Sequence, residues 1–214
     1  MSANTPAIGL PSTGSTVIGM DFGTTNSVAA VLQPDGAVQT VQGPGLEVFR
    51  TVLCFWAERG ALRHAAGPDG VAAYLDDPED TRLIMSMKTY LAQRSFSSTL
   101  VMGRPFTLEA LVALFLQGLL AGRDLDGARI VAGRPVRFAG DLADDALGEA
   151  RLRQSFRQAG LGEVDVAFEP EAAGFRFTRT LSGPATVLIG EGGVWRQLRR
   201  PACGHGDGPV VRRC

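Results

Sequence analysis

Short apolar runs separated by turn residues occupy positions 16 to 56 and predict a series of β-strands. Residues 16–22 (TVIGMDF) are an apolar run typical of a buried strand, and 27–32 are a second. Pro34-Asp35-Gly36 is a turn signal, and the apolar–polar alternation over 37–42 suits the returning strand of a hairpin. Residues 48–56 are rich in side chains that favour strands. We therefore expect several neighbouring strands near the start of the chain.

Two later stretches have the period of amphipathic helices. Thr107 is suited to cap the first helix and Gly122 to end it, with apolar residues between them at helical spacing. Asp141 is expected to cap the second helix, and Gly160 to end it. The positions of the second helix expected to face the core are Leu142, Ala146, Leu147, Phe156 and Ala159.

The remaining segments complete an α/β pattern. Residues 65–94 have a mixed, partly helical pattern, whereas 128–136, 164–168 and 186–189 are apolar runs typical of buried strands. The order is strands first, then strands that alternate with helices. This order predicts a mixed α/β fold.

Composition narrows the functional classes. The chain has 214 residues, 45% of them hydrophobic and 20% charged, as in globular proteins. This length suits one domain, or one lobe of a larger one. The net charge of −1 gives no basic field for nucleic acid and no polybasic patch for a membrane. The longest apolar stretch, 108–120, is interrupted by polar residues and too short to cross a bilayer.

Cysteine content and the chain ends bear on the compartment. The three cysteines have no CxxC spacing and are odd in number, which argues against a disulfide framework or a zinc site. Residues 1–15 are rich in Pro, Ser, Thr and Gly and have no period, so we expect a flexible leader. They lack the pattern of a secretory signal, and together with the cysteine usage this favours a cytoplasmic protein. Residues 191–214 have no strand or helix period; an out-of-frame translation is favoured over a disordered tail.

The segment from Asp21 to Ser27 (DFGTTNS) carries the chemistry. A buried strand delivers Asp21 at its end, and Gly23 gives the following turn the freedom to aim backbone N–H groups at a phosphate. Thr24 and Thr25 add hydroxyl donors, and Asp21 can hold hydrated Mg²⁺ through water. No GxxxxGK[ST] or GxGxxG phosphate loop is present. The alternative interpretation is a plain hairpin with a Gly-Thr turn.

Lys88 is the second candidate. It is the single lysine among 21 basic residues; all the others are arginine. Such a bias usually reflects gene composition, and one retained lysine is either chance or a position that a guanidinium cannot fill.

The Asp21–Ser27 segment, after a VIGM strand, resembles the first phosphate motif of the seventy-kilodalton heat-shock chaperones, the DnaK-like family within the actin/hexokinase ATPases. Segments 49–52 (FRTV), 87–91 (MKTYL) and 168–174 (FEPEAAG) resemble later family motifs in the same order. Segment 133–136 (GRPV) has the form seen in shorter, divergent bacterial members. The resemblance covers about 16–190.

The resemblance implies a fold and a set of roles. The fold would be a ribonuclease-H-like first lobe of an actin-type ATPase domain, with a smaller subdomain inserted near 51–127. Asp21 would orient Mg²⁺-bound water, and Lys88 would reach the γ-phosphate of ATP. Glu169 would lie close to the metal and the attacking water, and Pro135 would be a relay position or a structural turn. The contacts to the ATP or ADP phosphates would come from Gly23, Thr24, Thr25 and Asn26.

The chain departs from the family at its second phosphate clamp. The family has Asp-x-Gly-Gly-Gly-Thr after a strand like 187–189, whereas 190–195 read GEGGVW. Glu191 would be an imperfect substitute for the aspartate, because its longer side chain would misplace a metal-bound water. The 214 residues are also too few to hold a second lobe with an adenosine pocket or a peptide-binding β-sandwich beside the first lobe. We expect a truncated, catalytically impaired form in which weak Mg-phosphate binding survives and ATP hydrolysis is negligible, because phosphoryl transfer needs both sides of the phosphate chain fixed.

Three functions are consistent with these features. The favoured one is an ATP-binding, chaperone-type ATPase, whose full-length form would bind unfolded polypeptide or co-chaperones. A non-catalytic module that binds a partner through the exposed lobe face is the alternative. A small-molecule kinase of the same superfamily is less favoured, because segment 168–174 matches the chaperone branch better.

Overall fold

The structure, a computed structural model, describes residues 16–33, 35–41, 49–123, 125, 127–178, 182–183, 186–188, 196–198 and 210–211. The expected leader 1–15, the clamp-like segment 190–195 and most of 191–214 lie outside this part of the chain. The described residues form a mixed α/β structure. None of the helices in these ranges combines the length and apolar character needed to cross a membrane.

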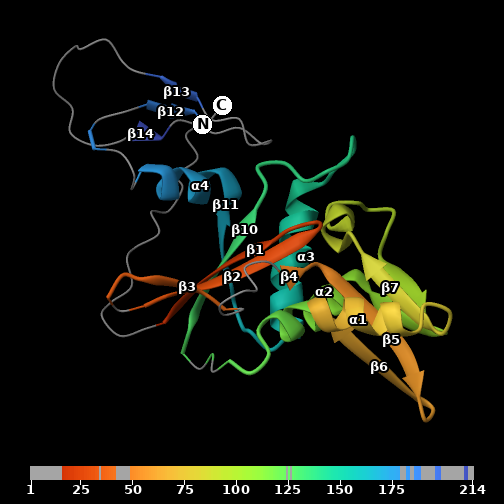
Figure 1. The fold of residues 1–214 in the computed structure, drawn as a ribbon. Helices are drawn as coiled ribbons and strands as arrows, with labels where there is room; N and C mark the ends of the chain where they lie inside the picture. Colours follow the sequence, from red (N-terminus) through yellow and green to blue (C-terminus); the bar gives the residue numbers. More distant parts are fainter. Residues whose placement is uncertain are drawn as a thin grey trace.

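The main sheet joins strands near the start of the described region with two later strands, β10 and β11 (Figure 1). Its order is β11-β10-β1-β2-β3, and the short β4 also pairs with β2. β1 pairs antiparallel with β2 and parallel with β10, which pairs parallel with β11. The strands are β1 (Val17–Phe22), β2 (Asn26–Leu32), β3 (Val38–Thr40), β4 (Phe49–Arg50), β10 (Arg129–Arg134) and β11 (Asp165–Phe168).

The strands expected between 16 and 56 are confirmed, and so is the turn between β2 and β3. The Gly36 N–H donates to the Gln33 carbonyl at 2.9 Å, with a positive φ of 83° at Gly36 that favours glycine. The strand expected at 128–136 is shorter, since β10 ends at Arg134.

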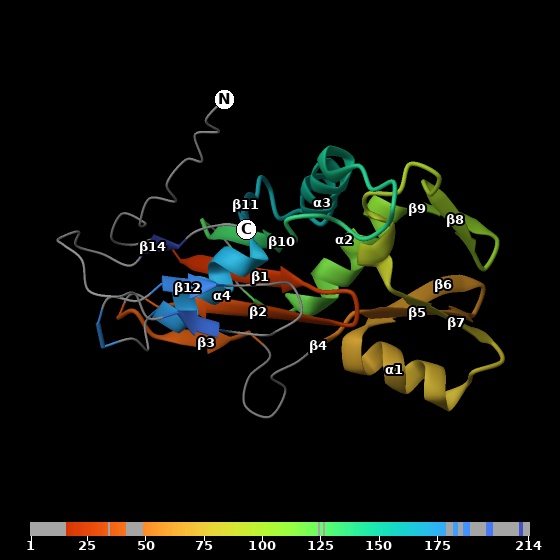
Figure 2. The same ribbon diagram turned by 90° about the horizontal axis from the view of Figure 1, so that it is seen from above.

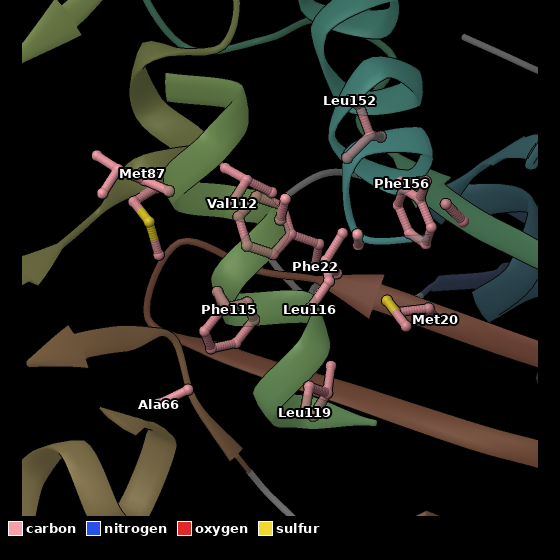
Figure 3. Close-up of a cluster of buried hydrophobic side chains, with 14 of the residues drawn as sticks. Met20, Phe22, Ala66, Met87, Val112, Phe115, Leu116, Leu119, Leu152 and Phe156 are labelled. Carbon is pink, nitrogen blue, oxygen red and sulfur yellow. The ribbon is translucent and has the colours of Figure 1, made fainter. Parts of the chain in front are cut away.

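One face of β1 carries the core. Its residues alternate, with Ile18, Met20 and Phe22 buried and Gly19 and Asp21 exposed. Two helices cover the buried face, α2 (Leu108–Leu119) and α3 (Asp145–Gln158), as Figure 3 shows around Phe22. The Phe22 and Phe115 rings lie 5.6 Å apart between their centroids. The end of β1 is therefore packed directly against α2 through these two rings.

The first helix begins where the sequence predicts. Thr107 Oγ1 accepts from the Ala110 N–H at 3.1 Å, which confirms the predicted cap. The helix ends at Leu119, ahead of the predicted stop at Gly122, and Gly122 has a φ of 74° in the turn that follows.

The expected start of the second helix is wrong. α3 begins at Asp145, and Asp144 is its cap, with Oδ1 accepting from the Leu147 N–H at 3.0 Å. Leu142, expected to be buried, is 94% exposed, because it precedes the helix. Ala146 is also exposed, since the face that packs on α2 is offset from the predicted one. That buried face consists of Gly148, Arg151, Leu152, Ser155 and Phe156.

A group of smaller elements lies between β4 and β10, to one side of the main sheet (Figure 2). One three-stranded sheet has the order β6-β5-β7, and β8 and β9 form a hairpin. These elements are β5 (Val52–Glu58), β6 (Ala61–Ala66), α1 (Gly67–Asp76), β7 (Thr81–Met85), the 3-10 helix η1 (Met87–Tyr90), β8 (Ser98–Val101) and β9 (Arg104–Thr107).

The described C-terminal elements follow β11. Helix α4 (Glu169–Thr178) starts immediately after that strand. The strand expected at 186–189 is present as β12 (Thr186–Leu188), which pairs with β13 (Arg196–Leu198) and β14 (Val210–Val211) in a separate three-stranded sheet.

Candidate functional site

The carboxyl ends of three parallel strands meet at one edge of the main sheet. Met20 is paired with Ala132 across β1 and β10, and Arg134 with Phe168 across β10 and β11. Asp21 follows Met20, and Glu169 follows Phe168, so the fold brings both carboxylates to this edge. In open α/β sheets this is the edge where ligands bind.

Strand alternation places Asp21 on the face of the sheet away from α2 and α3. Asp21 has the orientation of exposed Gly19, opposite to buried Met20. Gly133 in β10 has that same outward orientation and lies beneath Glu169. A Cβ added at Gly133 would lie 3.1 Å from the Glu169 Cγ and 3.5 Å from the Met20 carbonyl oxygen. The absence of a side chain at Gly133 therefore makes room for Glu169 beside the end of β1.

Lys88 reaches the same place from the smaller elements. Its Nζ lies 2.6 Å from Oε1 of Glu169, and the lysine side chain is only 13% exposed, against 32% for the glutamate. Lys88 is on η1, and Glu169 is the first residue of α4. The fold thus joins the two residues that the sequence identified separately.

The turn between β1 and β2 presents polar side chains to solvent. Asp21, Thr24, Thr25 and Asn26 are all exposed, whereas Phe22 is buried. A side chain at Gly23 would overlap the backbone carbonyl of Asn26. Gly23 is not among the residues with positive φ, so its requirement comes from this close approach of the backbone and not from a left-handed conformation.

Two buried hydroxyls hold this turn from below. Ser27 Oγ accepts from the Gly23 N–H at 3.2 Å and lies 2.8 Å from Thr51 Oγ1. The Thr51 N–H donates to the Thr25 carbonyl at 2.9 Å. Sequence reasoning did not assign this anchoring role to either residue. The available signal was that each is a polar residue beside apolar runs predicted to be buried strands.

Arg134 supports the end of β10 from the core side. Its guanidinium carbon lies 5.2 Å from the ring centroids of both Phe138 and Phe168. Its Nη1 donates to Glu149 at 2.8 Å, and its Nε donates to the Pro135 carbonyl at 2.9 Å. These contacts fix the strand end beneath Glu169, and they give Pro135 a defined place in the turn after β10.

The site offers few protein ligands to a metal ion. No group of three or more histidine, cysteine, aspartate or glutamate side chains that could hold one occurs in the described ranges. Mg²⁺ in phosphate sites keeps several waters and is bound through one or two carboxylates plus phosphate oxygens. Asp21, exposed at the strand end, fits that mode of binding and not an all-protein cage.

A concave region lies away from the candidate site. An open depression of about 610 Å³ among the smaller elements is lined partly by Trp56, Thr81 and Met102. It shares no residue with the edge formed by β1, β10 and β11. The candidate site is therefore assigned on its chemistry and not on the depth of its surface.

Comparisons with known proteins add no family to this description. No model of a known protein family matches the chain, and no curated protein sequence matches it either.

Proposed function

We propose that this chain binds the phosphate groups of ATP or ADP, with Mg²⁺, at the edge formed by β1, β10 and β11. The phosphates would bind in the way that the resemblance implies, as they do in the first lobe of an actin-type ATPase domain of the DnaK-like branch. The observation that carries the proposal is the contact between Lys88 and Glu169 beside the end of β1, the strand that leads into the Gly23 turn.

The topology supports the finer interpretation of the fold. The antiparallel strands β1, β2 and β3 are extended on the β1 side by β10 and β11, both parallel to β1. Helix α3 forms the crossover between β10 and β11. This arrangement, together with the position of Asp21 at the end of the first strand, is the one expected of a ribonuclease-H-like lobe.

Each residue would have a distinct task. The turn from Gly23 to Asn26 would donate N–H and hydroxyl groups to phosphate oxygens. Lys88 would exchange its partner Glu169 for a phosphate oxygen, where a compact ammonium serves as a point charge. Asp21 would hold water on Mg²⁺, which when bound neutralises phosphate charge. Glu169, released from Lys88, would then accept a hydrogen bond from a water near the terminal phosphate.

Isothermal titration calorimetry tests the proposal with a ligand series. Mg-ATP and Mg-ADP should bind the purified chain at millimolar concentration, adenosine should not, and EDTA should weaken the binding. Lys88→Met should lower the affinity about tenfold or more, a loss of about 1.4 kcal/mol. Gly19→Ala is the matched control, since Gly19 is exposed in β1 with open space around it. Equal binding of adenosine and ATP, or no binding of Mg-ATP, would contradict the proposal.

A further inference from the structure

Lys88 lies on a short segment whose conformation depends on contacts with the rest of the protein. η1 has four residues, a single 3-10 turn, and such short turns depend on tertiary contacts. Ser86, the residue before it, has a φ of 58°, in the left-handed region that a serine rarely adopts. Whatever fixes this segment also fixes the direction of the Lys88 side chain.

Arg151 of α3 fixes the segment from the core side. Its Nη1 donates to three backbone carbonyls, those of Tyr90 and Leu91 at 3.3 Å and that of Gln93 at 3.1 Å. Its Nε lies 3.2 Å from Oε1 of Glu109 in α2. The Arg151 side chain is 10% exposed, so these hydrogen bonds are made in a largely dry environment, where charge-assisted bonds are strong.

The neighbouring carbonyls are satisfied as well. The Thr89 carbonyl accepts from Gln93 Nε2 at 3.2 Å, and the Ala92 carbonyl accepts from the Asp144 N–H at 2.9 Å. Every carbonyl from Thr89 to Gln93 therefore accepts a hydrogen bond, three of them from one guanidinium. Asp144, the cap of α3, and Arg151, in the middle of that helix, thus hold this segment in place.

We propose that Arg151 is a positioning residue that aims the Lys88 ammonium at the Glu169 edge. Loss of its guanidinium would remove one donor from each of the three carbonyls and the donor of the Glu109 carboxylate. The Tyr90 and Gln93 carbonyls would keep the N–H groups of Gln93 and Phe96, but the Leu91 carbonyl would lose the donor that it has in the described structure, and the segment would relax. The part of the inference that concerns phosphate binding rests on the proposed function. The part that concerns the direction of Lys88 toward Glu169 does not.

Because Lys88 is the only lysine, its side chain can be observed alone. Isotope-labelled lysine gives one side-chain NMR signal, whose shift and relaxation report whether the ammonium is held. Arg151→Met should make this signal as mobile as that of a free lysine, and Arg151→Gln, which keeps an amide donor, should be intermediate. A lysine at position 151 is avoided, since it would add a second signal.

Arg153→Met is the matched control. Arg153 lies on the same helix and also pairs with a carboxylate, Glu149, and with a backbone carbonyl, that of Val164. Unlike Arg151, it makes none of its described hydrogen bonds or ion pairs with residues 86–93. This variant should lower stability and leave the Lys88 signal as in the wild type. Mg-ATP affinity should fall roughly tenfold in Arg151→Met and stay within about twofold of the wild type in Arg153→Met.

The outcomes separate the two proposals. An unchanged Lys88 signal in folded Arg151→Met overturns the positioning role, and if that variant does not fold, an unchanged signal in Arg151→Gln does the same. If the wild-type protein binds no Mg-ATP and Arg151→Met still makes the Lys88 signal mobile, the positioning role is supported and the proposed function is contradicted.

Discussion

The ammonium of Lys88 lies 2.6 Å from Oε1 of Glu169, although 81 positions separate the two residues in the chain. Lys88 comes from the single turn η1, and Glu169 begins helix α4. The Glu169 side chain is 32% exposed, so solvent screens the pair, and partly exposed ion pairs contribute little to folding. The contact is of interest because it places a cation and a carboxylate beside the carboxyl end of β1.

The pairing of Lys88 with Glu169 predicts a measurable coupling. In a double-mutant cycle, Lys88→Met and Glu169→Gln should give a coupling of about 1 kcal/mol in the free energy of unfolding. Urea denaturation of the two single variants and the double variant measures it. The matched cycle of Lys88→Met with Glu149→Gln should be additive, since Glu149 pairs with Arg134 and Arg153 instead. Additivity in both cycles would contradict the predicted coupling between Lys88 and Glu169.

Gly23 and Gly19 give opposite predictions for the same substitution. Gly23→Ala should destabilise the protein by about 1–3 kcal/mol, because the added methyl overlaps the Asn26 carbonyl and the turn must open. It should also abolish Mg-ATP binding. Gly19→Ala should be neutral or slightly stabilising, since nothing lies within 4 Å of the added Cβ. Thermal unfolding of the two variants checks the prediction, and equal melting temperatures would contradict it.

Local signals predicted much of this fold. The apolar runs of β1 and β2, the turn at Gly36 and the cap at Thr107 are all decided by residues close together in sequence. The start of α3 was not predicted, because Asp141, Asp144 and Asp145 are all good caps. Tertiary packing selects among them: Asp145 Oδ1 accepts from the Phe138 N–H at 2.8 Å, which leaves Asp144 to cap the helix.

The site shows the same limit. Residue type and motif order singled out Lys88 and Glu169, but the contact between them depends on the register of β10 with β11 and on the placement of η1. The buried arginines were not predicted at all. Arg151 was expected neither in the core nor against a backbone segment 58 to 61 positions away. Hydrogen bonds between a side chain and carbonyls so far away in the sequence leave no signal in the residues around Arg151.

The buried hydroxyl pair of Ser27 and Thr51 should contribute measurably to the free energy of unfolding. Ser27→Ala removes the acceptor of the Gly23 N–H and leaves the Thr51 hydroxyl without this partner, at a cost of about 1–3 kcal/mol. Thr51→Val should cost a similar amount, and the double variant less than the sum, because one change already breaks the pair. Urea denaturation of the three variants measures this. A double variant equal to the sum would show that the hydroxyls act independently.

The ion pairs of Glu149 should make the stability of the fold depend on pH in the acid range. Burial raises the pKa of its carboxyl, but hydrogen bonds and charge from Arg134 and Arg153 outweigh burial and hold the pKa below its usual value. As pH falls from about 4.3, the usual glutamate pKa, the unfolded chain takes up this proton before the folded protein does. The stabilisation is therefore complete above that pH and is lost as pH falls through the lower folded pKa.

Glu149→Gln should accordingly lower stability at pH 7 and flatten its decline between about pH 4.3 and the acid limit of folding. Urea denaturation at a series of pH values measures the profile. Glu163→Gln serves as the control, because the Glu163 side chain is 75% exposed in its pair with Arg157 and screening by solvent leaves such a pair little effect on stability. If the Glu149→Gln profile ran parallel to that of the wild type at all pH values, the ion pairs at this carboxylate would have no share in the acid response.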